Sequence, residues 1–319
     1  MNAEALVTRE LLPEAMDFLG GKVDVEVGAV GFDLPHAELL AKVADKKGLL
    51  SMLTDVVDAE VMDRAPGLKI IANCAVGFNN IDVEHARRKG ILVTNTPGVL
   101  TETTAELTLA LILAVLRRLP QAERFTRGKK FKGWALDLWL GKDLQGSRLG
   151  IIGFGRIGRA VALRAAAFGA EVVYCDPLRA RPDIEKFYKA ARLPLDDLLR
   201  TSDIVAIHAG LTTETRHLLS RERLALMKKD AVLINTARGP IVDEKALAEA
   251  LAAGRLWGAG LDVYEREPEI EERLFSLDNV VLLPHIGSAT YKTRLKMAMT
   301  AARNLIQGLG GERPDNLVS

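Results

Sequence analysis

The fold of this chain is decided by one stretch, Leu149-Gly-Ile-Ile-Gly153-Phe-Gly155-Arg-Ile-Gly158. Its apolar start is typical of a strand, the pattern G-x-G-x-x-G follows at once, and a helix is expected from Arg156 to Phe168. In such strand-to-helix turns the first glycine allows a tight turn, the second lets the backbone approach a pyrophosphate, and the third lets the helix pack closely on the strand. The stretch therefore predicts a dinucleotide-binding unit.

The residues around this turn indicate which dinucleotide is bound. The expected helix directs its positive end, with the free N–H groups of Gly155, Arg156 and Ile157, toward the phosphates. Asp176 ends the next strand, where a carboxylate accepts hydrogen bonds from the adenosine ribose and repels a 2′-phosphate. Arg179 follows on the same loop, and its charge would neutralise such a phosphate. We therefore expect NAD(H) as the favoured cofactor, with NADP(H) left open.

Short apolar runs alternate with helical patterns along most of the chain, which predicts parallel sheets covered by helices on both faces. The strands expected in the first part are Ala5–Val7, Val23–Val27, Gly48–Leu53, Lys69–Asn73 and Ile91–Thr94. The helices expected between them are Pro35–Ala44, Ala59–Arg64 and Val83–Arg88. The six strands expected in the second part are Arg148–Ile152, Glu171–Tyr174, Ile204–His208, Ala231–Asn235, Gly258–Leu261 and Val280–Leu283.

These elements predict an α/β fold with two Rossmann-like, doubly wound parallel-sheet domains. Residues 1–98 are expected to form a flavodoxin-like substrate-binding (catalytic) domain, and residues 99–286 an NAD-binding Rossmann domain. A last helix, at about Lys292–Leu309, leaves no room for another domain. We expect residues 287–319 to pack back on the first domain, which makes the catalytic domain discontinuous.

The segment between the two parts has a helix and an arm. Thr103 and Glu106 have the spacing of a capping box, which predicts a helix from there to about Arg118. That helix is apolar nearly all round, so we expect it to be buried between domains or between subunits. Residues 121–143 are basic and aromatic, with Trp134 and Trp139, and are expected to form an exposed loop or arm.

Composition excludes several classes of partner. The 319 residues are 48% hydrophobic and 27% charged, which is typical of a globular protein. A net charge of +1 provides no field for nucleic acid or an anionic membrane. The longest apolar-rich run, Ala105–Leu116, is too short to span a bilayer, and no secretory signal is visible. The two cysteines, Cys74 and Cys175, match no metal-ligand spacing. We expect a cytoplasmic protein without a metal site.

Three polar motifs follow expected strands, at the sheet edge where ligands bind in such folds. They are Ile234-Asn-Thr-Ala-Arg238-Gly-Pro, Leu261-Asp262-Val-Tyr-Glu265-Arg-Glu267-Pro268 and Leu283-Pro-His285-Ile-Gly-Ser-Ala-Thr290. Reduction of a 2-keto acid needs a cation for the carboxylate, an acid that protonates the forming alkoxide, and a group that keeps this acid charged. Arg238, His285 and Glu267 are residues of the right types. Spacing alone does not bring them together, and each is also compatible with a purely structural role.

Together with the glycine loop, these motifs resemble the D-isomer-specific 2-hydroxyacid dehydrogenase family, and within it most closely the glyoxylate and hydroxypyruvate reductases. Two further stretches carry the resemblance, Asn73-Cys-Ala-Val-Gly-Phe-Asn-Asn-Ile-Asp82 and Val93-Thr-Asn-Thr-Pro-Gly-Val-Leu-Thr101. The match covers essentially the whole chain. It implies hydride transfer between NAD(H) and a short 2-keto or 2-hydroxy acid.

The resemblance also implies roles for individual residues. Arg238, Glu267 (and not Glu265) and His285 are the implied catalytic residues. The residues implied to line the cofactor site are Thr104, Thr236, Ala237, Asp262 and Gly287. The backbone of Val76 and Gly77 is implied to hold the substrate carboxylate together with Arg238. Trp139 is implied to reach into the substrate pocket of a partner subunit of a homodimer, although simple interface packing explains a tryptophan there equally well.

Two departures and several alternatives stay open. Gly210 stands where the family usually has proline, and residues 135–137 replace a more polar stretch, so the side-chain preference of the substrate is not implied. The main alternative enzyme is 3-phosphoglycerate dehydrogenase or another D-2-hydroxyacid dehydrogenase, although we expect no regulatory domain beyond Ser319. Val76 disfavours phosphite dehydrogenase and Glu267 disfavours formate dehydrogenase. The alternative of another class is a non-catalytic NAD-sensing binding protein.

Overall fold

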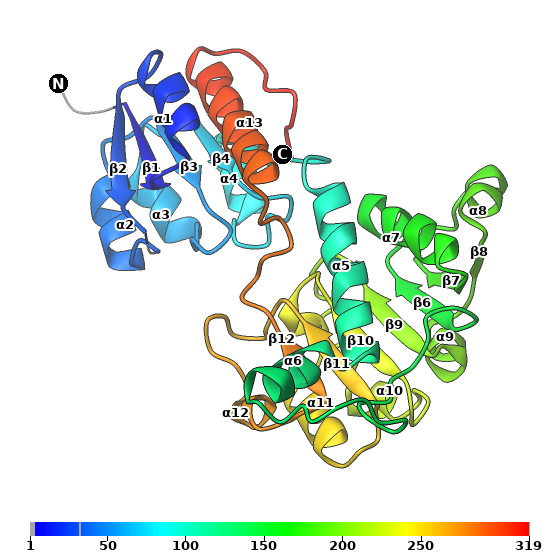
Figure 1. Cartoon of the computed structure of the whole chain (residues 1–319). Helices are drawn as coiled ribbons and strands as arrows, with labels where there is room; N and C mark the ends of the chain where they lie inside the picture. Colours follow the sequence, from blue (N-terminus) through cyan, green and yellow to red (C-terminus); the bar gives the residue numbers. More distant parts are fainter. Residues whose placement is uncertain (1–3, 32, 319) are drawn as a thin grey trace. The chain divides into compact units, whose positions relative to one another are not determined.

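The structure is a computed structural model of the chain that describes residues 4–31 and 33–318. It consists of two compact units, both visible in Figure 1. Unit 1 comprises residues 1–100 and 288–319, and unit 2 comprises residues 101–287. Unit 1 is therefore built from two separate segments of the chain.

Unit 1 has a five-stranded parallel sheet with the strand order β2-β1-β3-β4-β5. Its strands are β1 (Ala5–Arg9), β2 (Val25–Ala29), β3 (Gly48–Ser51), β4 (Ile70–Asn73) and β5 (Leu92–Thr94). The strands β1, β3 and β4 are buried along almost their whole length, because helices cover both faces of the sheet. This order is the one of flavodoxin-like sheets, in which the direction of winding reverses next to β1.

In the described residues, the helices that cover this sheet are α1 (Pro13–Gly20), α2 (His36–Val43), α3 (Ala59–Arg64), α4 (Val83–Lys89) and α13 (Tyr291–Leu309). Side chains of α2, α3 and α4 form one core layer, and those of α1 and α13 form the other. Thr290 caps α13, since its side chain accepts a hydrogen bond from the amide of Thr293. A Cβ atom at Gly308 would lie 2.3 Å from Ile70, so this glycine lets α13 lie directly on β4. The C-terminal helix thus completes unit 1 (Figure 1).

Unit 2 has a seven-stranded parallel sheet with the order β12-β11-β10-β9-β6-β7-β8. Its strands are β6 (Arg148–Ile152), β7 (Glu171–Cys175), β8 (Ala190–Arg192), β9 (Ile204–Ile207), β10 (Val232–Asn235), β11 (Gly258–Leu261) and β12 (Val280–Leu282). The first strand of this unit, β6, pairs with both β7 and β9. Winding therefore reverses at β6, the place where doubly wound sheets bind dinucleotides.

The helices of unit 2 also form two layers. They are α5 (Thr101–Leu116), α6 (Leu119–Arg127), α7 (Arg156–Ala167), α8 (Pro182–Tyr188), α9 (Leu195–Thr201), α10 (Arg221–Leu224), α11 (Glu244–Ala252) and α12 (Glu272–Phe275). Side chains of α5, α7 and α8 fill the core on one face of the sheet, and those of α9, α10, α11 and α12 fill the other. Two doubly wound α/β units, as expected from the sequence, are thus confirmed.

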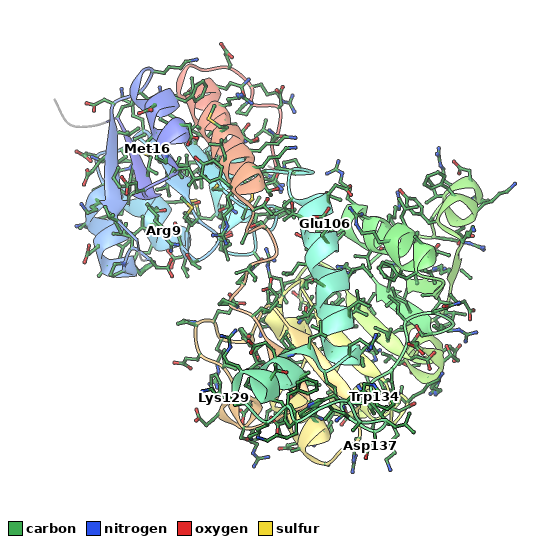
Figure 2. The ribbon with its side chains drawn as sticks, viewed as in Figure 1. Arg9, Met16, Glu106, Lys129, Trp134 and Asp137 are labelled. Atoms are coloured by element: carbon green, nitrogen blue, oxygen red, sulfur yellow. The ribbon has the colours of Figure 1, made fainter. Side chains whose placement is uncertain are left out.

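Some sequence expectations were wrong in detail. The sheet of unit 2 has a seventh strand, β8, which is only three residues long and has only its first residue buried. Helix α5 begins at Thr101, so Thr103 and Glu106 lie inside it and form no capping box. Glu106, labelled in Figure 2, instead approaches Arg164 of α7 at 3.5 Å. The expected arm is partly helical, because its first residues belong to α6. Helix α1 was not expected.

Two further properties bear on function. Among the described residues, none of the helices combines the length and apolar character that crossing a bilayer requires. In the same residues, no group of three or more His, Cys, Asp or Glu side chains is arranged to hold a metal ion. Cys74 and Cys175 are free thiols, and burial raises the pKa of Cys74 to about 12.

Candidate active site

The glycine loop between β6 and α7 leaves an open space over the end of the helix. Gly153 has φ 91° and packs against the backbone of His208, where a Cβ atom would come within 2.6 Å. A Cβ atom at Gly158 would lie 2.2 Å from the carbonyl oxygen of Gly153. At Gly155, in contrast, a Cβ atom would meet nothing within 4 Å. Protein packing therefore explains the glycines at positions 153 and 158, whereas Gly155 keeps space free for a ligand.

This space suits a pyrophosphate. Gly155 is the N-cap of α7, and Arg156 and Ile157 are its first residues. A glycine N-cap offers no side-chain oxygen, so the first N–H groups of the helix stay available to an anion. The twelve residues of α7 add the positive end of their dipole. The residues present therefore fit the diphosphate of a dinucleotide.

Asp176 lies beside this loop. One of its carboxylate oxygens accepts a hydrogen bond from the amide of Phe154 at 2.8 Å, and the other accepts one from the amide of Leu178 at 3.0 Å. The carboxylate is therefore fixed at the carboxyl end of β7, next to the glycine loop. The sequence analysis predicted that a carboxylate at this position binds the ribose hydroxyls.

His208 closes the loop from the neighbouring strand and was not singled out from the sequence. Its amide donates to the carbonyl oxygen of Ile152 at 2.7 Å, while Nε2 is buried without a hydrogen-bond partner among the described residues. Burial lowers the pKa of His208 to about 4, so the ring is neutral at physiological pH.

The buried His208 makes the stability of the protein depend on pH. Its pKa is lower in the folded chain than in the unfolded chain, so the unfolded chain binds the extra proton below about pH 6.5. The contribution of His208 to the free energy of unfolding is therefore full above about pH 6.5. It falls by about 3 kcal/mol as the pH drops toward 4. His208→Phe should flatten this dependence in urea unfolding measured between pH 7 and 4. Parallel profiles of variant and wild type would show that His208 is not responsible.

The loop after β10 holds Arg238. Asn235, at the end of the strand, accepts a hydrogen bond from the amide of Ala237 at 3.0 Å and donates one to the carbonyl oxygen of Arg238 at 3.0 Å. The guanidinium donates to the carbonyl oxygen of Ala237 at 2.7 Å. Burial lowers the pKa of Arg238, and the negative charge of Glu267 opposes this. Arg238 is therefore a cation on a rigid turn, within the electrostatic reach of Glu267.

Glu267 and His285 form a direct pair. Glu267 Oε2 lies 2.8 Å from His285 Nδ1, and Oε1 accepts a hydrogen bond from the amide of Tyr264 at 2.9 Å. The pKa of Glu267 is lowered overall. Burial raises it, but this effect is outweighed by the hydrogen bond and charge of His285, the hydrogen bond of the Tyr264 amide and the charge of Arg238. The carboxylate is therefore ionised at neutral pH. Because Nδ1 is bonded to Glu267, Nε2 of His285 is the ring atom left for a substrate.

The structure distinguishes Glu267 from its neighbour Glu265. Glu265 Oε1 lies 2.7 Å from Nε2 of His217, and its amide donates to Glu244 at 2.7 Å. Glu244 is itself buried and also accepts from the amide of Glu271. Glu265 thus holds the acidic turn in shape, whereas Glu267 is the carboxylate that meets His285.

Thr104, Thr236 and Gly287, which were also predicted for the cofactor site, meet around Asp262. Burial raises the pKa of Asp262, although its carboxylate accepts hydrogen bonds from the amides of Ile286 and Gly287 at 2.7 and 2.8 Å. Thr104 of α5 donates to the carbonyl oxygen of Gly287 at 3.1 Å. Thr236 is joined to this group through Thr108, whose hydroxyl lies 2.9 Å from that of Thr236. Unit 2 therefore brings the ends of β10, β11 and β12 together with the start of α5.

Val76 and Gly77 lie in unit 1, in the loop after β4. Asn95 donates to the carbonyl oxygen of Val76 at 2.8 Å, and Asn73 donates to that of Gly77 at 2.9 Å. Within residues 4–31 and 33–318, no hydrogen bond starts from the amide of either residue. The two carbonyls are thus fixed and the two N–H groups are available, as a carboxylate-binding loop requires. Asn73 and Asn95 were not predicted as site residues.

The arm after α6 was expected to be exposed, but one of its two tryptophans is not. Trp139 is half-buried, because its ring packs edge-to-face on Phe125 of α6 with 5.7 Å between the centroids. Its indole nitrogen is buried without a hydrogen-bond partner in the described part of the chain. The strongly exposed tryptophan is Trp134, at 82% exposure, which Figure 2 labels on this arm close to Asp137.

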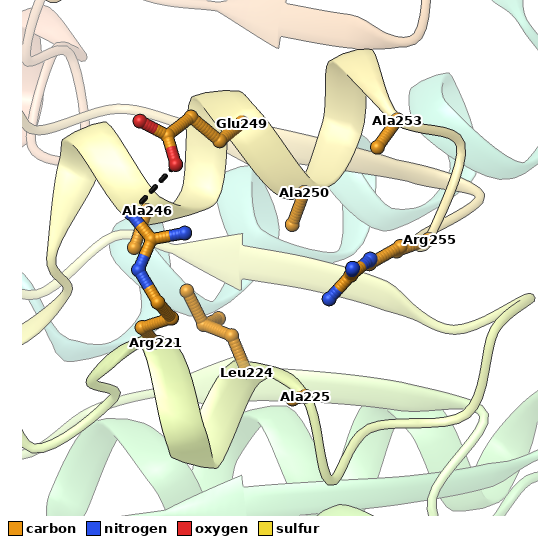
Figure 3. Close-up of a pocket in the computed structure, with 8 residues that line it drawn as sticks. All are labelled: Arg221, Leu224, Ala225, Ala246, Glu249, Ala250, Ala253 and Arg255. Atoms are coloured by element: carbon orange, nitrogen blue, oxygen red, sulfur yellow. Dashed lines mark ion pairs between the residues drawn. The ribbon is translucent and has the colours of Figure 1, made fainter.

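A separate pocket of about 240 Å³ lies between α10 and α11 (Figure 3). Alanine side chains and Leu224 line it, together with Arg255 and the ion pair of Arg221 and Glu249 at 2.6 Å. None of the residues predicted from the sequence for catalysis or cofactor binding lines this pocket.

Comparison with known proteins places this geometry in a family. The model of the family described as "D-isomer specific 2-hydroxyacid dehydrogenase, NAD binding domain" matches residues 109–287, more than half of the chain. The chain belongs to this family. It is accordingly an oxidoreductase with an NAD-binding domain, and the resemblance inferred from the sequence motifs is confirmed.

Family members of known identity are similar over their full length. A protein named glyoxylate reductase from Thermococcus kodakarensis is 49% identical, with 100% of this chain and 97% of the relative covered. A glyoxylate reductase from Aeropyrum pernix is also 49% identical, over 98% of this chain and 95% of the relative. Among solved structures, a Thermus thermophilus protein has a TM-score of 0.92 at 50% identity, with 99% of each chain covered.

A further solved structure was determined with ligands. It is a glyoxylate/hydroxypyruvate reductase from Sinorhizobium meliloti, described as NADPH-dependent and determined with NADP and malonate. Its TM-score is 0.88 at 32% identity, and 100% of this chain and 97% of that chain are covered.

Proposed function

We propose that this protein reduces glyoxylate and hydroxypyruvate to the corresponding 2-hydroxy acids by direct hydride transfer, with NAD(H) as its preferred cofactor. The observation that carries the proposal is the pair of Glu267 and His285, joined at 2.8 Å with Arg238 within reach of the same carboxylate. Relatives named glyoxylate reductase at 45–49% identity support the substrate class. D-Lactate and other D-2-hydroxyacid dehydrogenases of the same fold are the alternatives.

Each of the three residues has a chemical role. Arg238 binds the substrate carboxylate and polarises the keto oxygen with its guanidinium. The glycine loop would hold NADH, which would supply the hydride for C2 of the keto acid. The alkoxide that forms on the keto oxygen takes a proton from Nε2 of His285, and Glu267 stabilises the charged imidazole before this transfer. The net change is the addition of one hydride and one proton to the carbonyl group.

The cofactor assignment rests on the residues around the glycine loop. Gly153, Gly155 and Gly158, with the amides of Arg156 and Ile157, would hold the diphosphate, and Asp176 would bind the adenosine ribose. Asp262, Gly287, Thr104, Thr236 and Ala237 would line the nicotinamide end. The negative charge of Asp176 favours NAD(H) over NADP(H), because a 2′-phosphate carries nearly two negative charges of its own.

The remaining assignments belong to the same proposal. Unit 2 would be the NAD-binding domain and unit 1 the substrate-binding domain, in which the amides of Val76 and Gly77 contact the substrate carboxylate. We also propose a homodimer in which the arm with the exposed Trp134 packs on the partner and Trp139 faces its substrate. An exposed apolar arm of this kind is typical of a subunit interface. A cytoplasmic location stays a prediction.

Steady-state rates test the proposal. We expect turnover of glyoxylate and hydroxypyruvate with NADH, slower turnover of pyruvate, and a lower kcat/KM with NADPH for each substrate. A preference for 3-phosphohydroxypyruvate would indicate a 3-phosphoglycerate dehydrogenase instead. If NADH binds but no 2-keto acid is reduced, the protein is a non-catalytic NAD-sensing protein and the proposed reaction is wrong.

A further inference from the structure

The turn that follows β7 carries an arginine network which the proposed reaction does not use. Arg179 lies on this turn, a few residues after Asp176. Its Nε and Nη2 atoms donate to the two carboxylate oxygens of Glu185 in α8, each at 3.1 Å. This is a bidentate pair, the geometry in which an arginine and a carboxylate bind each other most strongly. The guanidinium of Arg179 is therefore committed to α8.

Glu185 is itself held by a buried residue of the strand. Its Oε1 accepts a hydrogen bond from the hydroxyl of Tyr174 at 2.7 Å, and the side chain is only 14% exposed. Tyr174 is completely buried, and its ring stacks on Phe154 of the glycine loop with 4.1 Å between the centroids. Hydrogen bonds from Arg179 and Tyr174 lower the pKa of Glu185, so the carboxylate stays charged. Glu185 is thus a fixed anion that holds Arg179 in place.

The second arginine near this turn is also engaged. Arg192 of β8 donates from Nη2 to the carbonyl oxygen of Asp176 at 3.0 Å and to that of Pro177 at 3.3 Å. The guanidinium groups of Arg179 and Arg192 therefore both have partners within the protein. The partners of Arg192 are neutral carbonyls, whereas the charge of Arg179 is compensated by Glu185. A phosphate on the adenosine ribose would therefore meet the carboxylate of Asp176 while Arg179 is paired with another anion.

We propose that Glu185 is a specificity-determining residue that acts through Arg179 and restricts the site to adenosine nucleotides with a free 2′-hydroxyl. It rests on the proposed binding of a dinucleotide at the glycine loop. Asp176 repels a 2′-phosphate directly, whereas Glu185 removes the cation that would compensate for this repulsion. Both anions thus disfavour a 2′-phosphate, but in different ways. Removal of Glu185 alone should let Arg179 reach the phosphate, while the carboxylate of Asp176 stays in place.

Nucleotide binding without turnover tests this role. Calorimetry would measure, in each variant and in wild type, the Kd of ADP and that of adenosine 2′,5′-bisphosphate, which carries a 2′-phosphate in place of the β-phosphate of ADP. In Glu185→Gln, the amide still accepts from Tyr174 but no longer holds Arg179 as an ion pair. We expect this variant to bind adenosine 2′,5′-bisphosphate about tenfold more tightly than wild type, with the Kd of ADP unchanged within about twofold.

Three further variants separate this role from a general loss of charge. Asp183→Asn breaks the neighbouring pair of Asp183 with Arg181, at 2.9 Å on the same helix, and should change neither Kd. Arg179→Ala alone should also change neither, because Arg179 is not available in wild type. Arg179→Ala combined with Glu185→Gln should abolish the gain.

Several outcomes would overturn the inference. They are an unchanged ratio of the two Kd values in Glu185→Gln, a gain that persists without Arg179, or weaker 2′,5′-bisphosphate binding in Arg179→Ala alone. Retained ADP binding shows that each variant is folded. If wild type binds neither nucleotide, the proposed cofactor site itself is wrong, a result distinct from a failure of the role of Glu185.

Discussion

Arg238→Ala is expected to lower kcat/KM for glyoxylate by about 10³-fold or more while the Kd of NADH stays within about twofold of wild type. Arg238 is assigned two tasks that both depend on its charge, namely binding of the carboxylate and polarisation of the keto oxygen. Loss of a single preorganised donor to a developing oxyanion already costs about 10²–10³-fold. The separate binding residues of the glycine loop explain why NADH affinity should persist.

Two variants serve as controls for Arg238. Arg238→Lys keeps the charge but loses the planar pair of donors, so it should recover only a small part of the activity. Arg221→Ala removes an arginine of the same unit that pairs with Glu249 in the pocket of Figure 3, and should keep kcat/KM near wild type. NADH binding, followed by fluorescence, reports whether each variant is folded. Turnover of Arg238→Ala close to wild type would show that its assigned role is wrong.

Most of the fold could be predicted from the sequence because its strands are buried on both faces. Such strands appear as short, nearly continuous apolar runs, for example Ile204–Ile207 and Val232–Asn235, and all of these were found. Edge strands carry less signal. Strand β8, Ala190–Arg192, has one buried residue in three and was therefore missed. The start of α5 was misplaced because a capping-box pattern also occurs inside helices.

For the candidate site, the sequence could supply residue types but not partners. Glu265 and Glu267 are two residues apart on one turn, and only the structure shows that the first pairs with His217 and the second with His285. The supporting residues Asn73, Asn95 and Asn235 act through backbone carbonyls, so no spacing rule reveals them. Arg179 appeared from the sequence as a possible phosphate ligand because nothing there indicated that Glu185 engages it.

Glu267→Gln is expected to lower kcat for glyoxylate reduction at pH 7.5 by about 10²-fold, since an amide no longer stabilises a charged imidazole. The pKa of Glu267 is below its ordinary value, so wild type keeps the carboxylate charge down to pH values below about 4.5 and loses its contribution only as the pH falls further.

Glu265→Gln is the matched control for this prediction, since it makes the same chemical change two residues away and breaks the pair with His217 instead. Reduction rates of both variants, measured from pH 5 to 9, separate loss of a carboxylate next to His285 from a general disturbance of the acidic turn. Glu265→Gln should keep the pH profile of wild type. Equal losses in the two variants would mean that Glu267 only shapes the turn and does not act on the proton donor.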